Sequence, residues 1–151
     1  MYKITYIPKY FDIQELMPPK MLSLEDSQAP KHLCQAWANF DPKLLETIDV
    51  IRGEIVQQPL LCNTWHMDGN RIYCGLRPSV CAIGAQQSRH KFGQAADLVC
   101  YKYTAEQMRQ MIIEQQDKLP YPIRIEDGVS WLHVDVADID YRGQKIYLFK
   151  G

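Results

Sequence analysis

The sequence predicts a single α+β domain with a small antiparallel sheet, two main helices and an irregular N-terminal segment. Apolar residues recur at helical spacing over 41–53 and 104–117, and short strand-like runs lie between and after these two stretches. The 151 residues, 46% hydrophobic and 23% charged, suffice for one sizeable core and are typical of a soluble globular protein. We expect residues 1–40 to form an extension that packs on a domain spanning 41–151.

Both helices are predicted from their ends as well as from their apolar faces. Asp41 can cap the first helix, and Gly53 is expected to end it or to cost its last turn some stability. Thr104 and Gln107 form a capping box for the second helix, which should extend to about residue 117. The apolar positions of the two helices are Leu44, Leu45, Ile48, Ile51, Ala105, Met108, Met111 and Ile112.

Strands are predicted from short apolar or alternating runs bounded by turn residues. The alternation over 123–126 and 130–136, with Asp127-Gly128 between them, is typical of a hairpin, and 145–149 should close the sheet edge. The remaining strand-like runs are 59–65, 71–78 and 98–101.

Charge, hydropathy and cysteine content indicate which partners and which cellular compartment the protein is expected to have. A formal net charge of −1 favours neither nucleic acid nor an anionic membrane surface as a partner. The first residues lack the apolar core of a signal peptide, and no apolar run approaches a membrane span, so we expect synthesis in a cytoplasm without membrane insertion. The five cysteines contain no C-x-x-C pair and are expected to be reduced and mostly buried, although Cys74 and Cys81 could bridge a loop outside the cell.

The stretch 88–97 carries the clearest chemical signal. It places His90 and Asp97 seven residues apart, and a turn at Gly93 would let the two side chains converge. Both residue types are good zinc ligands, and a catalytic zinc typically has three protein ligands and one open position. His133, in the later strand, is the candidate third ligand. Taken alone, a histidine on an apolar strand is more often structural, so its candidacy depends on the His90 and Asp97 pair.

A zinc hydrolase also needs a proton acceptor near the attacking water. Glu126 and Asp127 lie across the predicted hairpin turn from His133, and we favour Glu126 as the base, with Asp127 as the alternative. The same pair could instead be a solvated turn. Asp135 follows His133 on the same face of the strand, where it could accept a hydrogen bond from the ligand ring or face solvent.

Two further residues could contact a substrate. Arg77 follows Gly75-Leu76 and precedes Pro78, so a rigid turn could present its guanidinium to a carboxylate or a developing oxyanion; a surface salt bridge is an equal alternative. Ser88 could donate a hydrogen bond to substrate or cap the local backbone.

Taken together, these residues resemble a known family. The stretch Ser88-x-His90-x-x-Gly93-x-Ala95-Ala96-Asp97 is similar to the S-x-H-x-x-G-x-A-x-D signature of the M15 peptidases, the group of D-alanyl-D-alanine carboxypeptidases and phage endolysins. The segment 131–133 resembles the strand that carries the last ligand, and 75–77 resembles the family's G-x-R loop. The similarity extends over roughly 40–150 and is closest to small, single-domain phage members.

The resemblance implies the fold shared by hedgehog domains and D,D-peptidases, with 41–151 as a zinc peptidase domain. It implies zinc ligands at His90, Asp97 and His133, and a substrate-binding and transition-state role for Arg77. Many members have a glutamate three residues before the last histidine, where this chain has Ser130. The hedgehog-like arrangement, with the acid about six residues before it, suits Glu126 or Asp127.

The function implied is cleavage of peptide bonds in bacterial peptidoglycan by a phage endolysin or a virion-associated enzyme. Such a protein would be made in the host cytoplasm and reach the cell wall after holin-type release or as part of a virion, with other virion proteins as further partners. The alternative is a zinc-stabilised structural or binding module of phage that has the same fold and no turnover. A metal-free protein with a chance motif is a third hypothesis.

Overall fold

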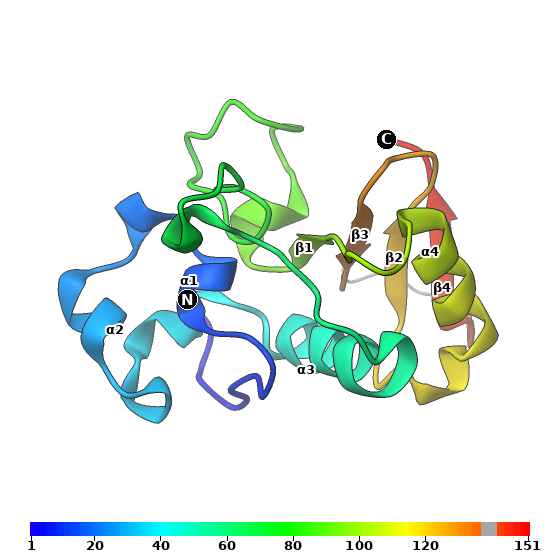
Figure 1. The fold of residues 1–151 in the computed structure, drawn as a ribbon, viewed down its shortest axis with the longest axis horizontal. Helices are drawn as coiled ribbons and strands as arrows, with labels where there is room; N and C mark the ends of the chain where they lie inside the picture. Colours follow the sequence, from blue (N-terminus) through cyan, green and yellow to red (C-terminus); the bar gives the residue numbers. More distant parts are fainter. Residues whose placement is uncertain (137–141) are drawn as a thin grey trace.

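The computed structural model describes residues 1–136 and 142–151, and it has the predicted α+β class (Figure 1). The helices are α1 (Ile13–Leu16), α2 (Leu24–Gln28), α3 (Pro42–Val50) and α4 (Ala105–Glu114), and α3 continues into a π-helical segment, η4 (Ile51–Val56). The strands are β1 (Ala95–Leu98), β2 (Ile123–Glu126), β3 (Leu132–Asp135) and β4 (Ile146–Phe149). Short 3-10 turns are η1 (Pro19–Met21), η2 (Lys31–Leu33), η3 (Gln35–Asn39), η5 (Trp65–Met67), η6 (Arg89–Phe92) and η7 (Gln116–Lys118).

The strands form a mixed sheet in the order β1-β3-β2-β4. The β1–β3 and β2–β3 pairs are antiparallel as predicted, but β4 runs parallel to β2, so the prediction of a wholly antiparallel sheet was wrong. Both edges of β3 are already occupied by β1 and β2. The returning chain therefore pairs with the outer edge of β2, and a strand antiparallel to β3 is necessarily parallel to β2.

The two faces of the sheet differ in chemistry because side chains alternate along each strand. The face toward the core carries fully buried apolar side chains, and the opposite face of β2 and β3 carries charged ones. The core-facing residues are Ala96, Leu98, Ile123, Ile125, Leu132 and Val134, each with 0% exposure. The opposite face presents Asp97, Arg124, Glu126, His133 and Asp135.

The first long helix begins as predicted and ends later than predicted. The Asp41 carboxylate accepts a hydrogen bond from the backbone N–H of Lys43 at 3.0 Å, so it acts as the N-cap. Gly53 does not end the helix, because the chain continues through η4 as far as Val56. The ring of Tyr10 lies against Gly53, where a Cβ atom would collide with it. The glycine is thus used for close packing rather than for termination.

The capping box predicted for the second helix, α4, is confirmed. The backbone N–H of Gln107 donates to Thr104 Oγ1 at 3.1 Å, and the backbone N–H of Thr104 donates to Gln107 Oε1 at 2.9 Å. The helix ends at Glu114, a few residues before the predicted limit, and is followed by η7.

Two predicted strands, 59–65 and 71–78, do not form. An isolated β-bridge between Leu61 and Val99 is their ladder pairing among the described residues, and single backbone hydrogen bonds such as Leu76 N–H to the Leu16 carbonyl tie them to other parts of the chain. Arg71 donates instead to the carbonyl oxygens of Cys62 and Asp97, at 2.7 and 3.0 Å, and Asn63 Oδ1 accepts from the backbone N–H of Cys74 at 2.9 Å. These side chains satisfy backbone groups that a strand ladder would otherwise satisfy.

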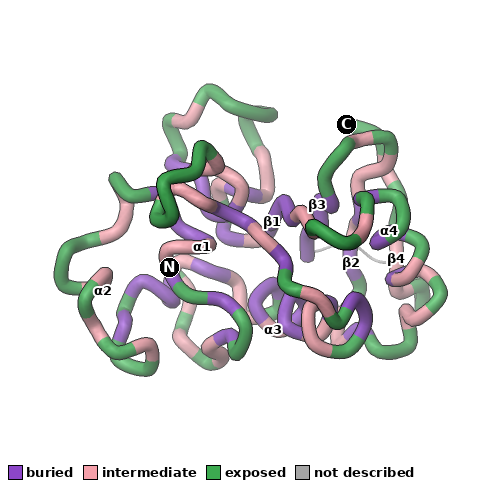
Figure 2. Tube along the Cα trace, viewed as in Figure 1, coloured by how far each residue is buried: buried purple, intermediate pink, exposed green. Residues whose placement is uncertain are grey.

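One hydrophobic cluster includes residues from 1–40 as well as from the rest of the chain. Figure 2 shows buried segments running from α1 through α3 to β1 and β3. The buried contribution of the first forty residues includes Phe11, Leu16, Met17, Trp37 and Phe40, each 0–1% exposed. Full burial of such a side chain contributes roughly 1.5–3 kcal/mol. None of the helices formed by the described residues is long and apolar enough to cross a membrane.

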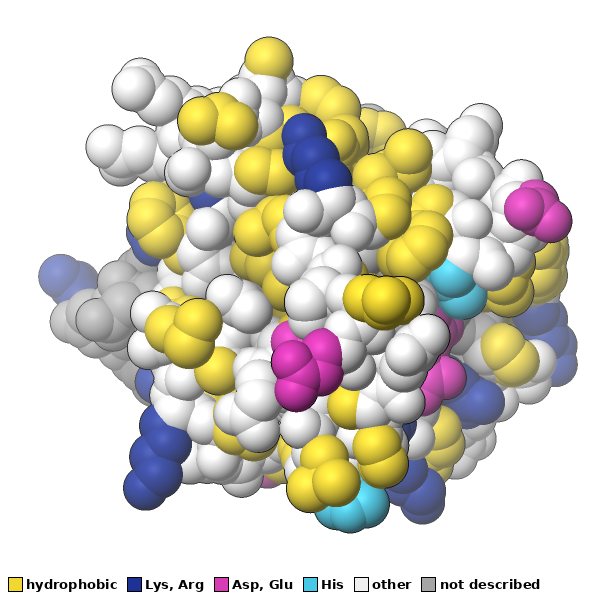
Figure 3. Space-filling view, turned by 90° about the vertical axis from the view of Figure 1, so that its left-hand side faces the viewer, with side chains coloured by type: hydrophobic (Ala, Val, Ile, Leu, Met, Phe, Trp, Pro, Cys, Tyr) yellow, Lys and Arg dark blue, Asp and Glu magenta, His cyan; other side chains and the backbone are white. Residues whose placement is uncertain are grey.

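Figure 3 shows the N-terminal side of the molecule, where the charged side chains that are drawn lie in small separate groups rather than in one continuous basic patch. All five cysteines are unpaired; Cys34 and Cys62 are buried, and Cys74, Cys81 and Cys100 are half-buried. Burial raises the pKa of the Cys62 thiol well above its usual value.

Candidate metal centre

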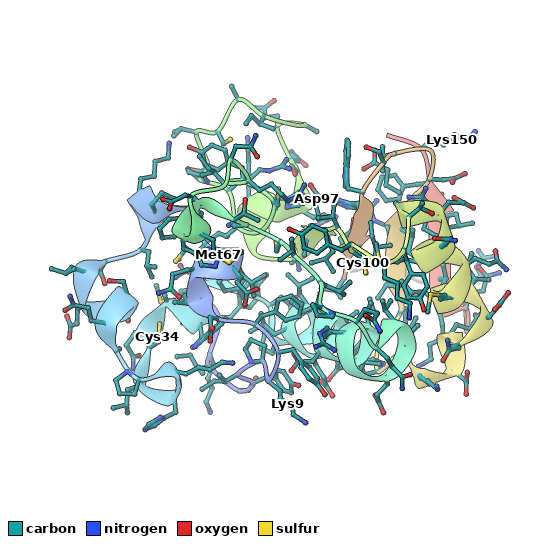
Figure 4. All side chains as sticks on the ribbon, viewed as in Figure 1. Lys9, Cys34, Met67, Asp97, Cys100 and Lys150 are labelled. Carbon is teal, nitrogen blue, oxygen red and sulfur yellow. The ribbon has the colours of Figure 1, made fainter. Side chains whose placement is uncertain are left out.

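His90, Asp97 and His133 come together as the sequence predicts. One potential ligand atom from each of them lies within 4.8 Å of the other two, and all three residues are buried. His90 Nε2 is 3.2 Å from Asp97 Oδ1, and His133 Nδ1 is 2.8 Å from the same oxygen. Asp97 lies near the centre of the molecule in Figure 4. This cluster can hold a metal ion.

The position of His90 depends on a sharp turn after η6. Gly93 has a φ of +66°, and a Cβ atom there would collide with the backbone carbonyl of Asn39. The turn therefore requires glycine for both its conformation and its packing. His90 Nδ1 donates to the carbonyl oxygen of Gly75 at 2.8 Å, which leaves Nε2 to face Asp97. A backbone carbonyl on the far nitrogen is a common way to orient a metal-ligating histidine.

His133 is held on its far side by Asp135. Its Nε2 donates to Asp135 Oδ2 at 3.0 Å, and its Nδ1 faces Asp97. Asp135 is fully buried and accepts two hydrogen bonds from Arg124. Burial alone would lower the pKa of His133, but the hydrogen bonds to Asp135 and Asp97 outweigh it and raise the pKa to about 9. Without a metal, the ring therefore carries both protons at neutral pH.

Asp97 stays ionised despite its burial. Desolvation would raise the pKa of its carboxyl group, but hydrogen bonds from His133 and His90 outweigh it and lower the pKa well below the usual value. Arg77 Nη2 also donates to Asp97 Oδ2 at 3.2 Å. Ligand atoms of a tetrahedral zinc site with bonds of about 2.0–2.1 Å lie about 3.3 Å apart, and the separations of Asp97 Oδ1 from His90 Nε2 and His133 Nδ1, 3.2 and 2.8 Å, are close to this value.

The three residues line one cavity of about 520 Å³, within the usual size range of small-ligand sites. Arg77, Ser88, Glu126 and Asp135 line it too, so the structure places these candidates together. Its other lining residues are Ile83, Gly84, Ala85, Gln87, Arg89, Arg124, Trp131, Phe149 and Gly151.

Asp127, the alternative base, lies away from the cavity. Its carboxylate is 3.9 Å from the guanidinium of Arg109, and its side chain is 43% exposed. Ser130 lines a separate cavity of about 480 Å³, whose other lining residues come from 99–104, α4 and the β2–β3 connection. Of the two acidic candidates, Glu126 is therefore the one on the same side of the sheet as the metal cluster.

Arg124 and Phe149 belong to the cavity but were not among the sequence candidates. The alternation Ile123-Arg124-Ile125-Glu126 does place Arg124 on the same face as Glu126, and this signal could have identified it. The rings of Phe149 and His133 are in T-shaped contact, with centroids 5.7 Å apart and planes at 85°. Phe149 comes from β4, so its position depends on a strand pairing that no local pattern indicates.

Comparisons with known proteins yielded no match: no family model, no curated protein and no solved structure is significantly similar to the chain.

Proposed function

We propose that the chain is a zinc-dependent peptidase that cleaves peptide bonds of bacterial peptidoglycan and is of the phage endolysin or virion-associated type. The observation that carries the proposal is the convergence of His90, Asp97 and His133 in a cavity that also contains Glu126 and Arg77. Two histidines and one carboxylate form the donor set of several catalytic zinc sites, in which a fourth position stays open. The substrate class follows from the resemblance to the M15 peptidases.

The chemistry is divided between the ion and the side chains of the cavity. Zinc, when bound, supplies Lewis acidity that acidifies a water molecule and polarises a carbonyl group. Glu126 accepts the proton of the attacking water and passes it to the leaving amine. Asp97 and Asp135 both lie in the same cavity, but both are hydrogen-bonded to histidine and arginine side chains. Glu126 is therefore the better proton acceptor among the acidic residues there.

Arg77 and Ser88 contribute to binding in this proposal. The guanidinium of Arg77 is buried, and its Nε donates to the carbonyl of Tyr73 at 2.7 Å, so its orientation is tightly constrained. Five N–H donors are available on a guanidinium, and the contacts to Tyr73, Ile83 and Asp97 engage three of them. The remaining donors serve a substrate carbonyl or carboxylate, and the Ser88 hydroxyl adds a hydrogen bond at the cavity wall.

Digestion of purified peptidoglycan tests the proposal. The wild-type protein with one equivalent of zinc should release muropeptides, and their masses would identify the bond that is cut. A chelator should abolish the release, and added zinc should restore it. Intact peptidoglycan in the presence of stoichiometrically bound zinc would contradict the enzymatic proposal.

That contrary result would favour a zinc-stabilised phage module without turnover. Its supporting observation is Ser130, which occupies the position of a glutamate in many M15 peptidases and lies outside the metal-site cavity. Release through a holin-type pore, or carriage in a virion with other virion proteins, completes the proposal for either function.

A further inference from the structure

A partly buried ion pair adjoins the metal cluster on the far side of His133. Arg124 Nε and Nη2 donate to the two carboxylate oxygens of Asp135, at 2.8 and 2.9 Å. The same carboxylate accepts from His133 Nε2 through Oδ2. The contacts form a continuous series from a guanidinium through a carboxylate to a candidate metal ligand.

The sheet itself brings this series together. Arg124 and Asp135 are direct partners in the β2–β3 register, so their side chains leave the same face side by side. The Arg124 guanidinium also lies over the ring of Phe149, 4.5 Å from its centroid, and that ring is in T-shaped contact with His133. The Asp135 side chain has no exposed surface, whereas that of Arg124 is 22% exposed. Strand pairing, the Phe149 ring and the burial of Asp135 thus all restrict the positions of the two side chains.

We propose that Arg124 is a positioning residue of the metal centre, acting on His133 through Asp135; this inference depends on the proposed zinc site. A carboxylate bound by one N–H of a histidine can still rotate about its terminal torsion, which has broad minima. The paired donors of Arg124 fix the plane of the Asp135 carboxylate. The fixed oxygen then holds His133 Nε2, so that Nδ1 points toward Asp97 and His90.

The proposal predicts a large effect from a residue that does not touch the ion. Changes to groups that hydrogen-bond a metal ligand typically reduce metal affinity 10–100-fold. Asp135 is the group of this kind, and Arg124 acts through it, so we expect a reduction toward the lower end of this range for Arg124→Met, which keeps a long unbranched side chain over Phe149 but has no N–H donors. Arg124→Lys keeps the charge but cannot form the paired hydrogen bonds, and its reduction should be smaller.

Zinc affinity, measured by competition with a chromophoric chelator, tests the proposal in the full chain without any substrate. The set comprises the wild-type protein, R124M, R124K, D135N and the R124M/D135N double variant. If Arg124 acts through Asp135, the zinc affinity of the double variant should be about that of whichever single variant binds zinc less tightly. If the two residues act independently, the fold reductions in affinity of the two single variants should multiply. Arg52→Met is a matched control, because Arg52 also lies over an aromatic ring, at 4.8 Å from the centroid of Tyr10, in the N-terminal half.

Substitution with cobalt supplies a second measurement. The visible absorption of Co²⁺ reports the geometry of its ligands, so the bands of R124M should change in shape and intensity while those of R52M should match the wild type. A zinc affinity for R124M within twofold of the wild type, together with unchanged cobalt bands, would overturn the positioning role and leave the zinc site intact. Failure of the wild-type protein to bind either ion would instead overturn the zinc site and this inference with it.

Discussion

Asp97 and His133 are direct cross-strand partners in the β1–β3 ladder, and their side chains meet at 2.8 Å between Oδ1 and Nδ1. Neighbouring strands hold opposite residues about 5 Å apart, so two potential ligands are brought together by backbone pairing alone. His90 completes the cluster from the turn that precedes β1.

Replacement of His133 by alanine should remove zinc binding and destabilise the metal-free protein. The change leaves Asp97 and Asp135 buried without one of their partners, although Arg77 and Arg124 still contact them. We therefore expect a loss of about 3 kcal/mol, at the lower end of the range for broken buried ion pairs. Urea denaturation in the presence of a chelator measures it. His66→Ala, at an exposed histidine beside Trp65, is the control and should change stability by less than about 0.5 kcal/mol.

Zinc should stabilise the protein more at pH 9 than at pH 6. The pKa of His133 is raised from 6.5 to about 9, so the protonated ring contributes stability that is fully present below pH 6.5 and is lost as the pH rises through 9. The ion must displace the Nδ1 proton, so zinc affinity should increase by up to about tenfold per pH unit over this window. Thermal unfolding at buffered free zinc, with and without the ion, measures both trends. A zinc-induced rise in Tm that does not grow with pH would contradict ligation through His133 Nδ1.

Glu126→Gln should reduce peptidoglycan cleavage at least about 100-fold, the usual minimum contribution of a general base. Asp127→Asn is the matched control, because its carboxylate points toward Arg109 rather than the metal cluster. It should retain activity within a few fold of the wild type. Zinc content should be unchanged in both variants, which separates loss of the base from loss of the ion. Equal losses in the two variants would rule out the assignment of Glu126.

Gly93→Ala should destabilise the protein more than Gly128→Ala. Both glycines have positive φ, +66° and +80°, so each alanine adds conformational strain of about 1–2 kcal/mol. A Cβ atom at Gly93 would also collide with backbone at Asn39, whereas nothing lies within 4 Å of one at Gly128. The difference should be at least about 1–3 kcal/mol, the usual penalty for overpacking. Chemical denaturation of the two metal-free variants measures it, and equal values would show that the contact at Asn39 can relax.

Local patterns predicted the parts of this structure that depend on neighbouring residues. The turn at Gly93, the capping box at Thr104 and the alternation that puts His133 opposite the core all follow from spacing within a few positions. The convergence of His90, Asp97 and His133 was inferred from the same information together with the family signature. Long-range pairing was harder to infer: β4 lies beside β2 because β3 has no free edge.

The failed strand predictions have a physical reason as well. Apolar runs over 59–65 and 71–78 indicate burial, but burial can be satisfied without a ladder when side chains supply the hydrogen bonds. Arg71 and Asn63 do so here, and nothing in the composition of those runs distinguishes the two outcomes. Phe149 was missed because its position depends on the pairing of β4 with β2, whereas the alternation over 123–126 already placed Arg124 on the face of Glu126 and could have identified it.

The unequal anchoring of the three candidate ligands has a kinetic consequence. Asp97 and His133 belong to one antiparallel ladder whose central strand is paired on both sides, so they should move together. His90 comes from a short 3-10 turn that is hydrogen-bonded to the Gly75 carbonyl and, through the Gly93 carbonyl, to the backbone N–H of Asp41 at the start of α3. A bound ion would tie this turn to the sheet. We therefore expect metal exchange to begin with the departure of His90, at a rate governed by the opening of that turn rather than by the unfolding of the sheet.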